Sequence, residues 1–148
     1  MASTCTIPLA LDTITAGLKL RTGLIGVKVF SGPVTQDDAG LECIAFGDVH
    51  GTEDPEAMVG EREEDYVIEG TLLAVKSGAG ETVIKAARDR AFAIYAEIEA
   101  YLNDDNTLGG RVLDAEPARV PDVEQVIQPE GRECYLDFGI RVRAIKNP

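Results

Sequence analysis

The chain has 148 residues, enough for one domain with a substantial core. Hydrophobic residues make up 45% of it and charged residues 27%, a balance typical of globular proteins. No apolar run approaches the roughly 20 residues that a membrane helix needs. The net charge of −12 repels nucleic-acid phosphates and therefore disfavours DNA or RNA binding. The N-terminal residues lack the basic flank of a secretory signal, so we expect synthesis in the cytosol.

The first half of the chain predicts one helix and two strands. From Ile7 to Arg21, apolar residues recur at steps of three and four, which is typical of an amphipathic helix. The segments Ile25–Pro33 and Leu41–Val49 have the apolar character and the bounding turn residues of short strands. The acidic, turn-rich stretch Gly51–Asp65 then predicts a long loop.

The second half predicts two long strands with the strongest helix of the chain between them. Asp65–Lys76 has apolar residues on both faces, which indicates partial cover on each side by a helix or a neighbouring subunit. A helix follows, with one apolar face from Ile84 to Leu102. Three prolines make Gly110–Gly131 an edge strand or loop. Cys134–Lys146 alternates as a half-buried strand, with Asp137, Arg141 and Arg143 pointing outward.

Strands that follow one another without intervening helices predict a mixed or mostly antiparallel sheet. The expected fold is therefore α/β of the α+β type, with about four or five strands flanked by two main helices in a single domain that spans residues 1–148.

The segment GDVHG places Asp48 and His50 on what the pattern predicts to be a strand end with a turn. Asp-x-His at a strand end is how a metallophosphoesterase site begins. Such a site needs further histidines, an asparagine and a bridging aspartate to complete two metal shells. His50 is the only histidine in the chain. It would also have to serve any Ser-His-Asp or Cys-His nucleophile, so the sequence predicts neither a catalytic residue nor an enzyme.

Ligand-binding motifs are equally incomplete. The segment Ser77–Glu81 lacks the Lys-Ser/Thr of a phosphate loop, and Val83 stands where GxGxxG needs its third glycine. In the stretch that begins at Asp104, Ala115 replaces the bidentate glutamate of a calcium loop. Cysteine and histidine are too few to close a zinc site, and two of the three cysteines, Cys43 and Cys134, lie in apolar strand patterns that favour burial. We therefore expect no metal and no cofactor.

The layout of the whole chain resembles the tail terminator proteins of long-tailed bacteriophages. The resemblance covers Ile7 to Ile145 and rests on an N-terminal helix, a strand pair, an acidic loop, a long strand, the helix ETVIKAARDRAFAIYAEIEAYL, the segment TLGGRVLDAE and the closing strand FGIRVRAIK. It implies a hexameric ring that caps the head-proximal end of the tail tube, stops tube polymerisation and presents a surface for joining to the head.

The same resemblance implies the partners and the location. The partners would be further copies of the chain, the tail tube protein and the head connector or completion protein, with no membrane involved. DNA would pass through the lumen without specific binding. The protein would reside in the neck of the virion after assembly in the host cytoplasm. Two alternatives stay open: another head–tail joining or neck protein of the same size, and, in a different class, a small metal-dependent phosphoesterase that uses Asp48 and His50.

Exposure and charge suggest which side chains contact partners or neighbouring subunits. The acidic stretch supplies most of the candidates, and its length and polarity predict contacts with the tail tube or the connector. The candidate interface residues are Glu53, Asp54, Glu61, Arg62, Glu63, Glu64, Arg88, Arg90, Arg141 and Arg143.

Overall fold

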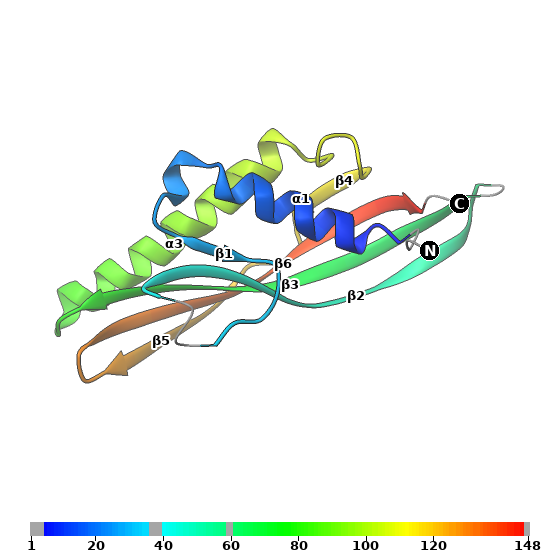
Figure 1. Cartoon of the computed structure of the whole chain (residues 1–148). Coiled ribbons are helices and arrows are strands. Elements are labelled where there is room, and N and C mark those ends of the chain that lie inside the picture. Colours follow the sequence, from blue (N-terminus) through cyan, green and yellow to red (C-terminus); the bar gives the residue numbers. More distant parts are fainter. Residues whose placement is uncertain (1–4, 36–39, 59–60, 147–148) are drawn as a thin grey trace.

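The structure is a computed structural model that describes residues 5–35, 40–58 and 61–146, with the backbone alone for 53–58 and 61. Its elements (Figure 1) are α1 (Ile7–Lys19), the short 3-10 helix η1 (Thr22–Leu24), β1 (Lys28–Phe30), β2 (Glu42–Met58), β3 (Glu61–Ser77), α3 (Glu81–Asp104), β4 (Asp114–Pro117), β5 (Asp122–Gln128) and β6 (Gly131–Lys146). None of the helices in these ranges is long and apolar enough to cross a membrane.

Six strands form one sheet in the order β1-β2-β3-β6-β4, and β5 pairs with β6 on the same edge as β4. Among the strands of the described ranges, only β1 and β2 run parallel, and every other pair is antiparallel. The predicted class, a mostly antiparallel mixed sheet with two main helices, is confirmed. The strand count rises to six because the proline-rich segment forms two separate edge strands, β4 and β5.

The predicted loop Gly51–Asp65 is wrong, because β2 continues to Met58 and β3 already begins at Glu61. These residues form the outer half of a long hairpin. Tertiary pairing overrides the weak strand propensity of the acidic residues: β6 lies beside β3 along its length and pairs Lys146 with Arg62. We call residues 49–58 and 61–68 the hairpin arm. Its strands extend past both helices in Figure 1.

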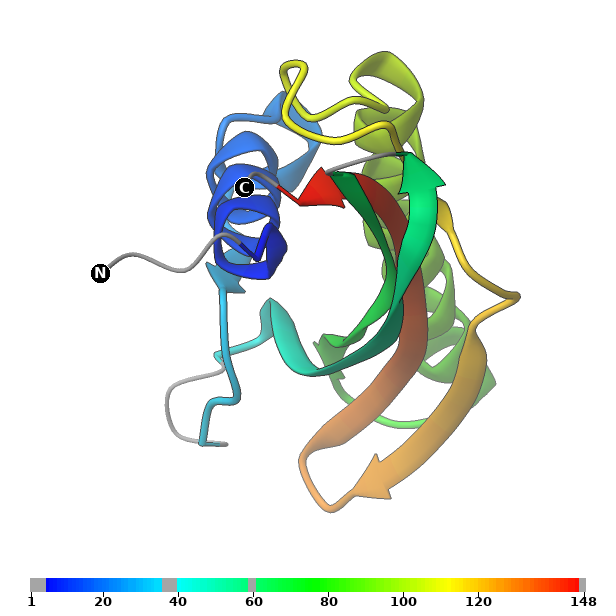
Figure 2. The ribbon, with the colours of Figure 1, turned by 90° about the vertical axis from the view of Figure 1, so that its right-hand side faces the viewer.

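Both helices cover the same face of the sheet, called the helix face below (Figures 1 and 2). The helix α1 ends at Lys19, so Arg21 lies beyond it in extended conformation rather than within it as expected. In α3 the buried residues are Ala87, Ala91, Ile94, Tyr95, Ile98, Tyr101 and Leu102, which confirms the predicted apolar stripe.

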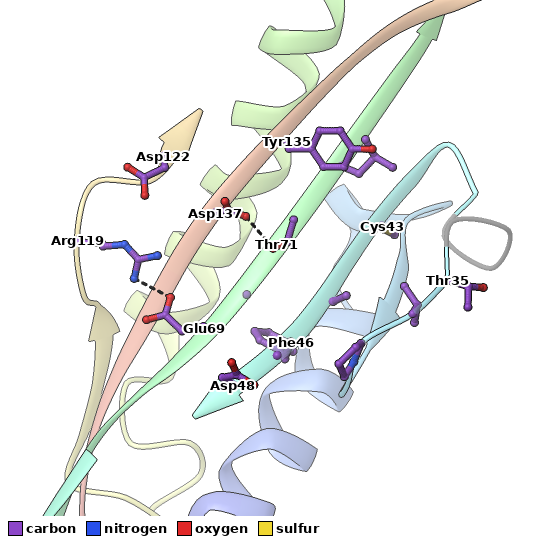
Figure 3. A pocket seen from close by; sticks show the side chains of 16 residues that line it. Thr35, Cys43, Phe46, Asp48, Glu69, Thr71, Arg119, Asp122, Tyr135 and Asp137 are labelled. Carbon is purple, nitrogen blue, oxygen red and sulfur yellow. Dashed lines mark hydrogen bonds and ion pairs between the residues drawn. The ribbon is translucent and has the colours of Figure 1, made fainter. Parts of the chain in front are cut away.

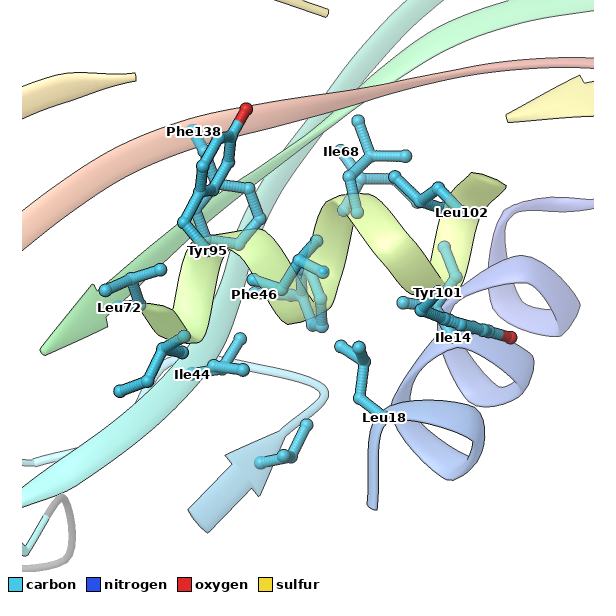
Figure 4. Packing of buried hydrophobic residues seen from close by; sticks show 14 of the residues in the cluster. Ile14, Leu18, Ile44, Phe46, Ile68, Leu72, Tyr95, Tyr101, Leu102 and Phe138 are labelled. Atoms are coloured by element: carbon cyan, nitrogen blue, oxygen red, sulfur yellow. The ribbon is translucent and has the colours of Figure 1, made fainter. Parts of the chain in front are cut away.

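The core fills the space between the helices and the sheet (Figure 4). The six inward positions predicted for β6 are all buried: Cys134, Leu136, Phe138, Ile140, Val142 and Ala144. Phe138 packs edge-on against Phe46 with ring centroids 6.0 Å apart, and it also contacts Tyr95 of α3 at 6.0 Å. Aromatic rings therefore join β2, β6 and α3 at the centre of the molecule.

The opposite face of the sheet, called the open face below, has little cover. On β3, Tyr66, Ile68, Leu72 and Ala74 are buried on the helix face as predicted, but of the opposite row only Leu73 is buried. Leu73 and Cys43 form a small second cluster with partly buried residues that include Phe30 and Val34. The partial cover predicted for this face thus comes from β1 and the segment after it.

Candidate assembly surfaces

Asp48 and His50, the two residues of the phosphoesterase alternative, both lie on β2. The prediction of a strand end at this point is wrong. Asp48 lies at a bulge within β2, between Phe46 and Val49, and the strand continues through His50, which pairs with Val67 of β3. His50 Nε2 lies 3.1 Å from Glu69 Oε1, and the other carboxylate oxygen of Glu69 lies 2.8 Å from Arg119 Nη1. Among the described residues, no group of three or more histidines, cysteines and acids is placed to hold a metal ion.

The exposure of His50 leads to a simple expected result. About two-thirds of its side-chain surface is accessible, so its contact with Glu69 is solvent-screened. We expect His50→Ala to change the free energy of unfolding by less than about 0.5 kcal/mol. Chemical denaturation of the two proteins would measure this. A phosphoesterase built on Asp48 and His50 would instead lose its activity in the same variant.

The open face carries a groove of about 740 Å³ over the middle of the sheet (Figure 3). Its polar groups are largely paired with one another. Thr71 Oγ1 donates to Asp137 Oδ1 at 2.8 Å, and Arg119 forms its ion pair with Glu69. Asp48 and Asp122 add negative charge to the lining. The groove is an acidic, open surface whose charged and polar groups are held by contacts with one another.

Two further groups in the groove have pKa values that argue against nucleophilic chemistry. Burial raises the pKa of the Cys43 thiol, so the reactive thiolate is disfavoured. Burial, followed by the hydrogen bond to Glu133, raises the pKa of the Tyr135 hydroxyl to about 12. Neither group is activated at neutral pH.

The hairpin arm is attached to the helix layer by a buried carboxylate. Glu64 is only 7% exposed, and its Oε1 accepts hydrogen bonds from the Thr6 backbone N–H at 2.9 Å and from Thr6 Oγ1 at 2.8 Å. The Tyr66 hydroxyl lies 3.0 Å from Thr6 Oγ1. Thr6 is the residue that precedes α1, so this contact fixes the start of the first helix against β3.

The pKa of Glu64 reflects two opposing effects. Burial favours the neutral acid, but hydrogen bonds from Cys5 and Thr6, together with the charge of Lys146, outweigh it and hold the pKa below the ordinary value of 4.5. Glu64 was predicted as an interface residue. Because its carboxylate is used inside the chain, we do not carry it into the proposed contact surface.

The other candidates on the arm and on β6 differ in how they are placed. Arg141 forms a bidentate pair with Asp65, at 3.0 and 2.7 Å, on the open face. Arg143 lies 3.8 Å from Asp114. Both arginines point outward, as predicted, and about 45% of each side chain is accessible. On the arm Arg62 is exposed and Glu63 is half-buried, while the side chains of Glu53, Asp54 and Glu61 lie outside the described part of the structure.

The two arginines of α3 serve contacts within the chain. Arg88 bonds to the neighbouring Asp89, which also accepts from Lys85 at 2.6 Å. Arg90 Nε lies 2.6 Å from Glu42 Oε2 at the start of β2, and this partly buried pair joins α3 to the sheet. The structure therefore separates Arg88 and Arg90 from the arm residues, and the candidates form no single patch.

Sequence reasoning missed one surface, the outer edge of β5. This strand is exposed along most of its length, with 46% of Val123 and 70% of Ile127 accessible. A partial signal was present in the sequence, because Val123 and Ile127 are four residues apart and so fall on the same face of a strand, between two prolines. Its meaning depends on β6, which provides the pairing partner.

Comparisons with known proteins give a likeness in structure alone. No family model matches the chain, and no curated protein matches it. Among solved structures, it is similar to a chain in the virion of a native gene transfer agent (GTA) particle, with a TM-score of 0.51 over 90% of this chain and 94% of that chain. The two sequences are 14% identical, so the likeness establishes a shared fold over nearly the full length of both chains.

Proposed function

We propose that this chain is a structural protein of a phage-like virion. The observation that carries the proposal is the fold shared, over 90% of the chain, with a component of a gene transfer agent virion. The open face fits a protein that works by contact, because its charged groups pair with one another around a shallow groove. It follows that the protein acts through its surfaces and its shape.

Within the virion, we propose the role of tail terminator. In this role the chain forms a hexameric ring on the head-proximal end of the tail tube, stops tube growth and provides the surface to which the head is joined. The hairpin arm supports the proposal because it extends past both helices and combines acidic residues with the exposed Arg62. The outward Arg141 and Arg143 lie beside it on β6. The net charge of −12 suits a lumen through which DNA passes without adhering.

The test is a shortened arm. Replacing residues 54–63 by Asn-Gly would place a two-residue turn directly after the pair of Glu53 with Glu64. The change removes the pairs of Asp54 with Glu63 and of Met58 with Glu61, and it retains the contact of Glu64 with Thr6. We expect a folded protein that no longer stops the polymerisation of tail-tube protein, so that electron microscopy shows tubes of uncontrolled length. Circular dichroism and a thermal melt would verify the fold.

A matched control separates the shape of the arm from its charge. The control keeps the full arm and neutralises four of its seven acidic groups, through the changes Glu53→Gln, Asp54→Asn, Glu61→Gln and Glu63→Gln. If the shortened protein caps tubes normally, the role of the arm is refuted. Attachment to isolated heads in place of tube ends would instead identify a head–tail joining protein.

A further inference from the structure

The two outer edges of the sheet are both open. The sheet begins with β1, which pairs only with β2, and it ends at β4 and β5, which pair only with β6. Within the described ranges, no strand lies beyond β1 or beyond β5. Each edge therefore presents backbone N–H and C=O groups that a further strand is able to bind.

The side chains along these edges are complementary in charge. At the β1 edge, Lys28 is exposed and the exposed Lys19 lies close by, at the end of α1. At the β5 edge, Asp122 and Glu124 are exposed. Lys28 shares the open face with its β2 partner Cys43, and Glu124 shares that face with its β6 partner Tyr135. Lysine and carboxylate thus lie on the same face of the sheet at its opposite edges.

Both edges also expose large aliphatic side chains. Ile25, three residues before β1, is 76% accessible, and Leu20, at the end of α1, is 86% accessible. On β5, Val123 and Ile127 lie on the helix face and are 46% and 70% accessible. Burial of such side chains against each other would remove apolar surface from water and so favour association. An edge strand with exposed aliphatic residues on one face and charged residues on the other has side chains that can pair with those of an added strand.

The strand directions allow a sheet that continues from copy to copy. Since β1 is parallel to β2, and the pairs β2–β3, β3–β6 and β6–β5 are antiparallel, β1 and β5 run in opposite directions. A second copy rotated about an axis along the strands would bring its β5 antiparallel to β1, the commoner and more stable arrangement. Such a contact joins two different surfaces, as the heterologous contact of a ring requires.

We propose that β5 of one copy adds to β1 of the next copy as an antiparallel strand. In the register that places Lys28 opposite Glu124, Phe30 faces Asp122 on the open face and Val29 faces Val123 on the helix face. Ile25 then comes close to Ile127. The register aligns a charge pair on one face of the junction and aliphatic pairs on the other. This inference deepens the proposed ring by assigning its subunit contact.

Disulfide trapping tests the register directly. Opposite residues of antiparallel strands have Cα atoms about 4.5–5.5 Å apart, within the range that a disulfide spans. Lys28→Cys and Glu124→Cys would be prepared as separate full-length proteins, mixed at high concentration and treated with a mild oxidant. We expect a dimer that contains one chain of each variant, at least ten-fold more abundant than the dimer from the control mixture of Lys28→Cys with Thr71→Cys. Thr71 is exposed on β3, which β2 separates from the β1 edge and β6 from the β5 edge.

A charge exchange provides the second measurement. Lys28→Glu and Glu124→Lys should each weaken self-association in sedimentation experiments, and the protein with both changes should regain it. Cross-linking no greater than in the control would overturn the proposal. If the chain then still assembled into particles, only the subunit contact would be wrong. If the cross-link formed but the chain were absent from particles, the proposed function would be wrong and the contact would stand.

Discussion

Phe138→Ala is expected to lower the free energy of unfolding by about 4 kcal/mol, the loss typical of a fully buried phenylalanine. Phe138 has no accessible surface, and its ring contacts both Phe46 and Tyr95. Removing it leaves a cavity where β2, β6 and α3 meet. Because β2 and β6 are both hydrogen-bonded to β3, the backbone cannot move far enough to close this cavity. Urea denaturation followed by circular dichroism would give the difference. A loss below about 1 kcal/mol would contradict the packing described here.

The control for this prediction uses the glycine directly across the ladder. Gly70 pairs with Phe138, and a Cβ atom at Gly70 would lie 2.5 Å from the far end of the ring. Gly70→Ala should therefore cost about 2 kcal/mol through overpacking in the wild-type chain. In a Phe138→Leu background the ring atoms are gone, and the same change should cost about 1 kcal/mol less. Equal costs in both backgrounds would show that the ring and the glycine are not coupled.

The strand β6 and the helix α3 could be predicted from the sequence because their hydrophobic patterns match the periods of regular structure. Alternate residues of Cys134–Ala144 are buried, and the apolar stripe of α3 faces the sheet. Each of these hydrophobic patterns involves the residues of one continuous segment alone. Local periodicity is sufficient where one element buries one face against the core.

The hairpin arm could not be predicted in this way. Many of its residues are acidic, and Gly51 and Pro55 also lie in it; all of these locally favour a loop. The strands form because β3 has β2 on one side and β6 on the other, as in the pairs of Tyr66 with Gly51 and with Val142. That information lies about 75 residues further along the chain, and no local window contains it.

The contacts of the candidate interface side chains likewise could not be predicted from local sequence. Charge alone marked Glu64 as a surface residue, yet it is buried beside Thr6, which lies 58 positions earlier in the chain. Arg141 and Arg143 were correctly placed on the outward face by alternation, but their partners Asp65 and Asp114 follow only from the strand register. Alternation along the strand predicts the direction of these side chains, and tertiary pairing decides what they contact.

The same buried carboxylate supports a pH-dependent prediction. Glu64→Gln is expected to lower the free energy of unfolding by about 2 kcal/mol at neutral pH, because it removes the charge that strengthens the hydrogen bonds from Thr6. The folded-state pKa of Glu64 lies below the ordinary value of 4.5. The carboxylate therefore contributes its full stabilisation above that value and loses it as the pH falls through the lowered folded-state pKa. The wild-type advantage over the variant should shrink across this acidic range.

Glu63→Gln is the matched control, since it makes the same chemical change one residue earlier, on the half-buried opposite side of β3. We expect it to change stability by less than about 0.5 kcal/mol. Urea denaturation of all three proteins between pH 7 and pH 3 would compare them. If the two variants lose equal stability, or if the loss in Glu64→Gln is the same at every pH, then Glu64 does not hold the arm to the first helix. A positive result would establish an internal anchor at the base of the arm, so that the exposed residues further out are free to serve contacts with other proteins of the particle.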